Sequence, residues 1–191
     1  MNIEEQPNTI NDKYTLFVNF DLLNKMPNEF DGFLEIAKIQ NTTKSKTAMF
    51  VFYDKKNYDK TNYIMYTRTI KKDGKNIWCA IIKDEFLERM RKNIKIASFG
   101  IFHELGHFLN GDYNNEYATS GKEMSILRRK AIENGKVLEN ELKADEFAVS
   151  QVGKSCAINF FDYSILRRKK IDNSKVAILE LELRKKHIKN L

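Results

Sequence analysis

Two histidines and a glutamate lie within a nearly all-apolar stretch, residues 94–110, with the sequence IKIASFGIFHELGHFLN. Apolar residues fall on every side of this stretch, which is typical of a helix packed inside a protein. His103 and His107 are four residues apart, so on a helix both imidazoles lie on one face, close enough to hold one cation. Glu104 lies about 100° further round the helix. We therefore expect a buried helix that carries a metal site.

The spacing of these three residues is that of the His-Glu-x-x-His motif. In this motif two neutral imidazoles bind zinc, and the glutamate handles the proton of a zinc-bound water. The chain has three histidines in all, and two of them are in the motif. The alternative is a pair of core histidines bonded to backbone carbonyls. That alternative must also explain Glu104, because burying an unpaired carboxylate costs on the order of several kcal/mol.

A catalytic zinc needs a third protein ligand and leaves its fourth position to water. The metzincin pattern would place that ligand just after the motif, with glycine at position 110 and histidine at position 113. This chain has Asn110 and Tyr113 instead. The third ligand must therefore come from another part of the chain.

Residues 138–152, LENELKADEFAVSQV, are predicted to form a helix that supplies this ligand. One face of the helix is marked by Leu138, Leu142, Val149 and Val152. Glu141 and Asp145 lie on the same face, where carboxylates cost free energy unless they are paired or bind metal. The alternative is two solvated carboxylates on an amphipathic helix. Beside the histidine pair, we expect Glu141 as the third ligand and Asp145 as a hydrogen-bond partner of a ligating imidazole.

HELGH, followed roughly thirty residues later by ELKADEFA, resembles the gluzincin group of zinc peptidases. The small size and the continuation of the second motif are most similar to the ImmA/IrrE-like peptidases of bacteria and their mobile elements. The resemblance covers residues 94–153 and says little about residues 1–75. It implies that His103, His107 and Glu141 bind one zinc ion per chain. It also implies Glu104 as general base and Asp145 as the partner of His103.

The resemblance implies a zinc-dependent metallopeptidase that hydrolyses peptide bonds of a protein or peptide substrate. Two alternatives stay open. One is a regulatory protease or antirepressor of ImmA/IrrE type that acts on one specific partner, such as a transcriptional repressor. The other is a non-catalytic zinc-binding interaction protein. A peptidase also needs a donor for the oxyanion. The candidates are Tyr117, Tyr163, His187 and an arginine of the RRK clusters, which are Arg128-Arg129-Lys130 and Arg167-Arg168-Lys169, and the sequence does not choose among them.

The predicted fold class is α+β, a small antiparallel sheet with an N-terminal helix packed beside a mainly helical C-terminal half. We expect a single domain over 1–191, with a sheet-containing half (1–93) and a helical half that carries the metal site (94–191). Strands are predicted over 14–20, 47–53, 63–70 and 76–83, and a helix over 27–41. Asp73-Gly74 predicts a hairpin, and Asp84 is expected to cap a short helix. By resemblance, the strand 76–82 would rim the cleft with an exposed edge that pairs with substrate.

The C-terminal half contains an internal repeat. SILRRKAIENGKVLENEL, from Ser125, aligns with SILRRKKIDNSKVAILEL, from Ser164. The simplest interpretation is a duplicated helix, turn and helix, with turns at Asn134-Gly135 and Asn173-Ser174. Because Arg184 stands in the second copy where the first has Asp145, we expect the second copy to be structural support.

The formal net charge is +7, and three basic clusters contribute to it, namely Arg128-Arg129-Lys130, Arg167-Arg168-Lys169-Lys170 and Arg184-Lys185-Lys186. Acidic residues are interleaved with them, and neither a helix-turn-helix nor a zinc-finger pattern is present, so we expect a solvated surface rather than a nucleic-acid interface. The N-terminus lacks the pattern of a secretion signal, and charges interrupt the longest apolar run. The two cysteines are interpreted as free thiols in a reducing compartment. A cytoplasmic protein without membrane partners is therefore expected.

Overall fold

The structure, a computed structural model, divides the chain into two compact units. It describes residues 4–5, 13–27, 32–55, 64–72, 74–112, 121–171 and 173–191. The first unit is Met1–Ile101 and the second is Phe102–Leu191, so the boundary lies within the helix that carries the histidine pair. The predicted halves meet slightly earlier, at residue 94. The described strands belong to the first unit and the second is helical, which confirms the predicted α+β fold class.

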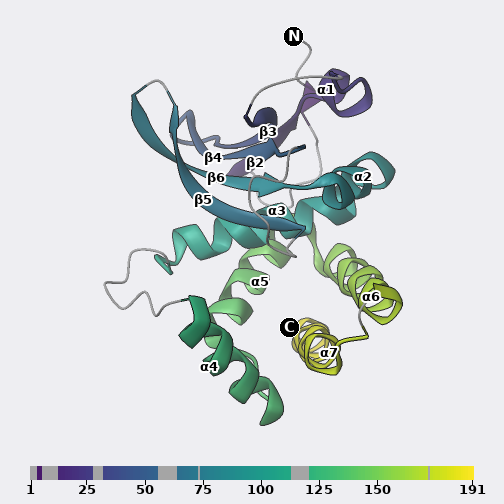
Figure 1. Cartoon of the computed structure of the whole chain (residues 1–191). Helices are drawn as coiled ribbons and strands as arrows, with labels where there is room; N and C mark the ends of the chain where they lie inside the picture. The colour runs from purple at the N-terminus through teal and green to yellow at the C-terminus, as the bar shows by residue number, and fades with distance from the viewer. Residues whose placement is uncertain are drawn as a thin grey trace. The chain divides into compact units, whose positions relative to one another are not determined.

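Six strands form one mixed sheet in the first unit (Figure 1). They are β1 (Glu4–Glu5), β2 (Tyr14–Val18), β3 (Leu34–Asn41), β4 (Lys46–Tyr53), β5 (Met65–Lys72) and β6 (Lys75–Ile82), in the spatial order β1-β2-β3-β4-β6-β5. The predicted strands are thereby confirmed as β2, β4, β5 and β6. Leu16, Ile39 and Met49 lie opposite one another on adjacent strands and are buried, so they belong to the core of this unit.

The hairpin predicted at Asp73-Gly74 joins β5 and β6. These strands pair antiparallel, and Lys72 lies opposite Lys75 at the turn. Gly74 has a φ of 75°, a conformation that glycine adopts without steric cost. Asp73 itself lies outside the described residues.

The sheet is mostly antiparallel, as predicted, but it differs from the expectation in one strand pair and at one edge. β4 and β6 run parallel, with Val51 opposite Ala80, so the sheet is not antiparallel throughout. β6 was expected to present an exposed edge, but β4 pairs on one side of it and β5 on the other. The physical reason lies in the run Cys79–Ile82, which is fully buried and apolar on both faces of the sheet, as suits an interior strand. In the described sheet, β5 is the outer strand at this end.

The helix predicted over 27–41 is wrong for residues 34–41, which form β3, and residues 28–31 lie outside the described part of the chain. Register shifts between Glu35 and Ala37 and between Ile39 and Gln40 interrupt the alternation of a regular strand. These irregularities produced an apolar spacing that imitates a helix. The N-terminal helix is instead α1 (Phe20–Asn24), which Asn19 caps by accepting a hydrogen bond from the Leu22 amide at 3.1 Å.

Two helices follow the sheet, α2 (Asp84–Lys92) and α3 (Ile94–Leu109). The expectation that Asp84 caps α2 is wrong by one residue, because Lys83 is the N-cap and Asp84 belongs to the first turn. The Asp84 carboxylate instead accepts a hydrogen bond from the Tyr53 hydroxyl. α3 matches the predicted metal-binding helix, and it begins in the first unit and ends in the second.

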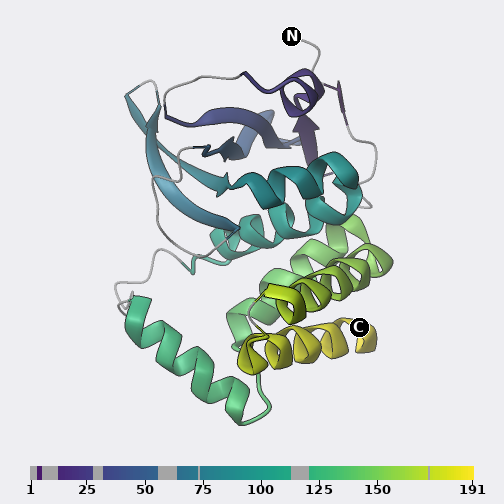
Figure 2. The same cartoon turned by 45° about the vertical axis from the view of Figure 1, so that its right-hand side comes forward.

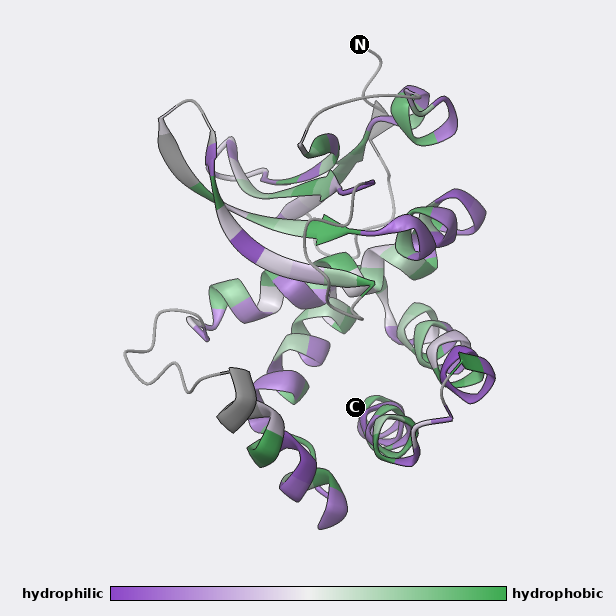
Figure 3. Cartoon of the chain, in the orientation of Figure 1, coloured by the Kyte–Doolittle hydropathy of each residue, from purple (hydrophilic) through white to green (hydrophobic). Residues whose placement is uncertain are grey.

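The second unit contains four further helices. They are α4 (Gly121–Glu133), α5 (Glu139–Val152), α6 (Lys154–Ile171) and α7 (Lys175–Asn190). α5, α6 and α7 pack against one another, whereas α4 projects away from α6 and lies against α7 (Figure 2). Hydrophobic and hydrophilic residues are interspersed along α6 and α7 (Figure 3), and the buried positions of α7 are Glu180, Arg184 and Ile188.

The predicted duplication of helix, turn and helix is confirmed by the order of these elements. α4 and α5 form the first copy, and α6 and α7 form the second. Gly135 and Asn173 both have positive φ, 68° and 45°, at the two predicted turns. Among the helices that the structure describes, none combines the length and apolar character that a membrane crossing needs.

Candidate metal centre

Gly106 allows α3 and α5 to approach closely. A Cβ atom at this position would lie 2.9 Å from Ala144 Cα and 3.1 Å from its carbonyl oxygen, closer than side-chain atoms normally come to a backbone. Ala144 is itself fully buried. Because two small residues meet here, α5 can present the side chains next to Ala144 to the histidine pair on α3.

The inward face of α5 consists of small and polar residues. Its buried positions are Glu141, Ala144, Asp145, Ala148 and Gln151. The apolar residues that located this face in the sequence, such as Leu142 and Val149, are only half-buried. The carboxylates therefore lie nearer the centre of the inward face than the apolar pattern indicated.

Three buried side chains, those of His103, His107 and Glu141, converge on one point. The two histidine Nε2 atoms are 3.0 Å apart. Glu141 Oε2 lies 3.6 Å from Nε2 of His103, and its Oε1 lies 3.7 Å from Nε2 of His107. Ligand atoms around a tetrahedral zinc are about 3.4 Å apart, given bonds of about 2.1 Å. These three residues thus form a cluster that could hold a metal ion.

A carboxylate lies within hydrogen-bond distance of the Nδ1 atom of each histidine in the cluster. Asp145 Oδ1 lies 2.9 Å from His103 Nδ1, and Asp112 Oδ2 lies 2.7 Å from His107 Nδ1. A carboxylate in this position fixes the ring tautomer and leaves Nε2 free to bind a cation. Asp145 was expected to have this contact, whereas Asp112 was missed. The only signal for Asp112 was its place just after the end of the helix, where Gly111 turns the chain with a φ of 75°.

Arg184 of α7 is the most important residue that the sequence interpretation missed. It is buried, and its Nη1 lies 2.9 Å from Glu141 Oε2. Its Nε and Nη2 donate to the two oxygens of Asp145 at 2.7 and 2.6 Å. The second copy of the repeat therefore contributes a cation to the centre, in addition to its structural role. The available signal was the replacement of Asp145 by arginine at the aligned position.

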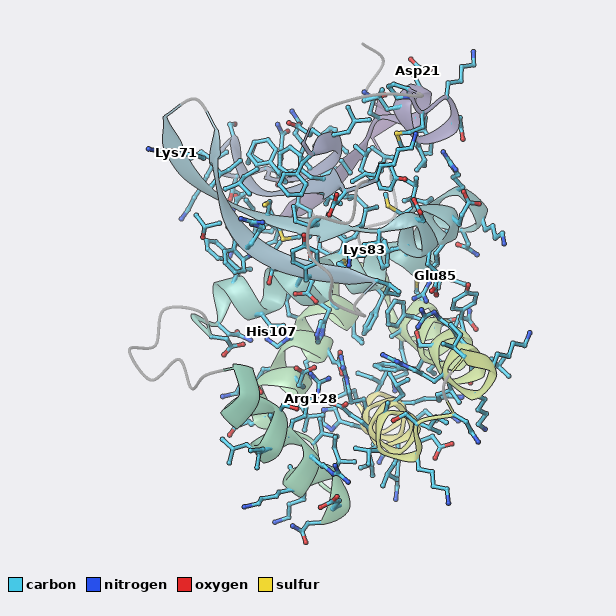
Figure 4. All side chains as sticks on the ribbon, viewed as in Figure 1. Asp21, Lys71, Lys83, Glu85, His107 and Arg128 are labelled. Atoms are coloured by element: carbon cyan, nitrogen blue, oxygen red, sulfur yellow. The ribbon has the colours of Figure 1, made fainter. Side chains whose placement is uncertain are left out.

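A second arginine, Arg128 of α4, approaches the carboxylate of Glu141. Arg128 Nη1 lies 3.5 Å from Glu141 Oε1, and Arg128 Nε donates to Glu180 Oε1 at 2.7 Å. Figure 4 labels Arg128 on α4 and His107 on α3. Glu180 is buried, whereas the Arg128 side chain is 37% exposed. Arg128 thus joins the buried cluster to the surface of the second unit.

These charges change the pKa values of the central groups. Burial alone would raise the pKa of Glu141, but Arg184, His103 and Arg128 together hold it well below its usual range. Burial alone would likewise raise the pKa of Asp145, and Arg184 and His103 lower it. Burial and Arg184 act to lower the pKa of His103, yet Asp145 and Glu141 outweigh them and raise it to about 9. Both carboxylates are therefore charged at neutral pH.

The other candidate residues take different positions. Glu104 is half-buried and follows His103 directly on α3. Tyr117, like Tyr113, lies outside the described residues. Tyr163 is 40% exposed on α6, and His187 Nε2 lies 2.8 Å from Glu146 Oε1 in an exposed pair. Among the candidates that the structure describes, Arg128 contacts Glu141 of the cluster.

Comparison of the chain with protein-family models, with curated proteins and with solved structures gives no match.

Proposed function

We propose that this protein is a zinc-dependent metallopeptidase that hydrolyses peptide bonds of a protein or peptide substrate. The observation that carries the proposal is the convergence of His103, His107 and Glu141 on one point, with Glu104 next to His103 on the same helix. Two imidazoles and one carboxylate form a three-residue ligand set used by zinc hydrolases. When bound, zinc supplies a Lewis acid that acidifies water and polarises a carbonyl group.

The residues around the ligands support this chemistry. Asp145 and Asp112 each accept a hydrogen bond from the Nδ1–H group of a ligand histidine, which leaves the Nε2 atom of that ring to bind the cation. Against the effect of burial, Arg184 and Arg128 hold the pKa of Glu141 well below its usual range, so Glu141 carries the negative charge that a metal ligand needs. These neighbours thus set the tautomer of the ligand histidines and the charge of the ligand carboxylate.

Glu104 is assigned as the general base. Its carboxylate takes a proton from the water that attacks the peptide carbonyl, and a bond forms between the water oxygen and the carbonyl carbon. The carbonyl oxygen then carries a negative charge, for which Arg128 is the proposed donor because its half-exposed guanidinium reaches the cluster. Glu104 next delivers the proton to the amine nitrogen as the carbon–nitrogen bond breaks.

A Glu104→Gln variant tests the assignment, because an amide fills the same space but cannot accept the proton. The zinc-loaded variant should keep its metal and its thermal stability and cleave denatured casein at least about 100-fold more slowly than wild type. Glu139→Gln, at an exposed position of α5, serves as the matched control and should cleave at the wild-type rate. Equal rates for the Glu104 variant and wild type would remove Glu104 from the mechanism. Failure of the zinc-loaded wild type to cleave casein or a peptide library would contradict the proposed activity.

A further inference from the structure

Arg184 lies between the two buried carboxylates of Glu141 and Asp145. Without Arg184, the negative charges of these two groups would not be fully balanced. Its guanidinium binds Glu141 through Nη1 and binds both oxygens of Asp145 through Nε and Nη2. The guanidinium also packs over the ring of Phe161, with its central carbon 5.3 Å from the ring centroid. These contacts hold one cation in a fixed position between the two carboxylates.

Without such a cation, the folded protein would be strongly destabilised. Glu141 and Asp145 are 8% and 0% exposed, and a buried carboxylate is tolerated only when it is paired or binds a metal. Arginine suits this place because it remains charged in proteins and its planar donors match a carboxylate with two parallel bonds. Arg184 can therefore hold the centre together when no metal is bound.

The same position brings Arg184 into conflict with a divalent cation. Arg184 Nη1 binds an oxygen of Glu141, and Nη2 lies 3.3 and 3.4 Å from the two ring nitrogens of His103. A metal bound to these residues would lie within a few ångströms of the guanidinium, where two positive charges repel each other in a poorly solvated site. Because arginine does not lose its proton, its charge persists when the metal enters.

We propose that Arg184 is the internal counter-ion of the metal-free centre, and that Arg184 and the metal act as alternative counter-ions for Glu141. In this arrangement Arg184 stabilises the metal-free fold and at the same time weakens metal binding. The inference rests on the metal centre of the proposed function and does not depend on peptide hydrolysis. Arg184 is a positioning residue here, since it acts on the metal through Glu141.

The test combines Arg184→Met with Arg184→Lys, which retains the charge but loses the planar pair of bonds. Arg129→Met is the matched control, because Arg129 is an exposed arginine on α4 paired with Glu133. Zinc affinity is measured by competition with a chromophoric chelator, and the melting temperature is recorded with and without saturating zinc. Neither measurement depends on catalytic activity.

Arg184→Met should bind zinc at least about 10-fold more tightly than wild type, because the repulsion between the charges is gone. It should melt well below wild type without zinc and close to wild type with zinc. Arg184→Lys should keep zinc affinity within about threefold of wild type, because lysine also carries a positive charge. Arg129→Met should do the same, because it leaves Arg184 in place. If Arg184→Met were unfolded without zinc but folded on its addition, the inference would equally be supported.

Equal or weaker zinc binding by Arg184→Met would overturn the inference, as would a variant that stays unfolded at saturating zinc. A wild-type protein that binds no zinc would instead contradict the metal centre on which both proposals rest. Zinc-bound wild type without casein cleavage would contradict the proposed peptidase alone.

Discussion

Asp145 and Arg184 occupy equivalent positions in the two copies of a duplicated segment, and they bind each other. Two hydrogen bonds of 2.7 and 2.6 Å join the Arg184 guanidinium to the Asp145 carboxylate in the interior of the second unit. α5 and α7 pack with these equivalent positions facing each other. Two aspartates at this contact would repel, so the opposite charge in the second copy is what allows the duplicated helices to pack together.

This pairing predicts that Asp145 supports the fold as well as the metal. Asp145→Ala should lower the free energy of unfolding of the metal-free protein by about 3–5 kcal/mol, because it leaves Arg184 buried with only part of its pairing. Urea unfolding followed by circular dichroism measures this change. The double variant Asp145→Ala/Arg184→Met should be less destabilised than the sum of the single variants.

Glu139→Ala is the control for Asp145, because Glu139 is an exposed residue of the same helix, paired with Lys143. It should leave both unfolding and zinc content unchanged. If Glu139→Ala changed the free energy of unfolding and the zinc content while Asp145→Ala changed neither, the inward face of α5 would have been assigned wrongly.

Asp112 provides a second prediction that separates metal binding from folding. It lies in the turn after α3, it is half-buried, and it contacts His107 Nδ1 at 2.7 Å. Asp112→Asn should weaken zinc binding by about 10-fold to 100-fold, because it removes the carboxylate that orients a ligand imidazole. Its melting temperature without zinc should stay near that of wild type.

Competition with a chelator checks the effect of Asp112→Asn, and Asp162→Asn is the control. Asp162 is a half-exposed aspartate of the same unit that pairs with Lys185. If both variants changed zinc affinity to the same extent, the contact between Asp112 and His107 would have no special role.

Gly106 provides a third prediction. Gly106→Ala should destabilise the protein by about 1–3 kcal/mol and reduce its zinc content, because the added methyl group would collide with the backbone of Ala144 and push α5 away from α3. Glu139→Ala, at an exposed position of α5, should do neither. Thermal melting and metal analysis of the same samples test both effects. An unchanged zinc content in Gly106→Ala would show that the centre does not need the close approach of the two helices.

Arg128 provides a fourth prediction, which concerns catalysis. Arg128→Gln should lower kcat by about 100-fold with little change in KM, since an oxyanion donor acts mainly in the transition state. Arg129→Gln removes the neighbouring exposed arginine and should leave both constants unchanged. A steady-state analysis with a cleaved peptide provides the measurement. A rise in KM without a fall in kcat would indicate that Arg128 binds substrate in the ground state instead.

The parts of the structure that depend on local pattern were predictable from the sequence. α3 follows from a long apolar run, and the placement of His103 and His107 on one face follows from their spacing of four residues. The same spacing relates Glu141 and Asp145 on α5. The duplication was visible because its two copies share an identical stretch of residues.

The parts that depend on distant contacts were not predictable in this way. Arg184 meets Asp145 across 39 residues of sequence, and no periodicity along one helix reveals that contact. β6 lies inside the sheet because β4 pairs beside it. The sequences of β4 and β6, taken separately, do not reveal that these two strands pair. β3 was mistaken for a helix because its register shifts disrupt the twofold alternation on which strand prediction depends.

The most direct test of the central claim is the metal content of purified protein by mass spectrometry after dialysis against zinc and then against buffer alone. The wild-type chain should retain about one zinc ion, and His107→Ala should retain almost none, because two protein ligands hold zinc too weakly to survive the second dialysis. His187→Ala, which removes the histidine that pairs with Glu146, should retain as much zinc as wild type. Full zinc content in His107→Ala, or no zinc in wild type, would contradict the assignment of His103, His107 and Glu141 as a zinc centre.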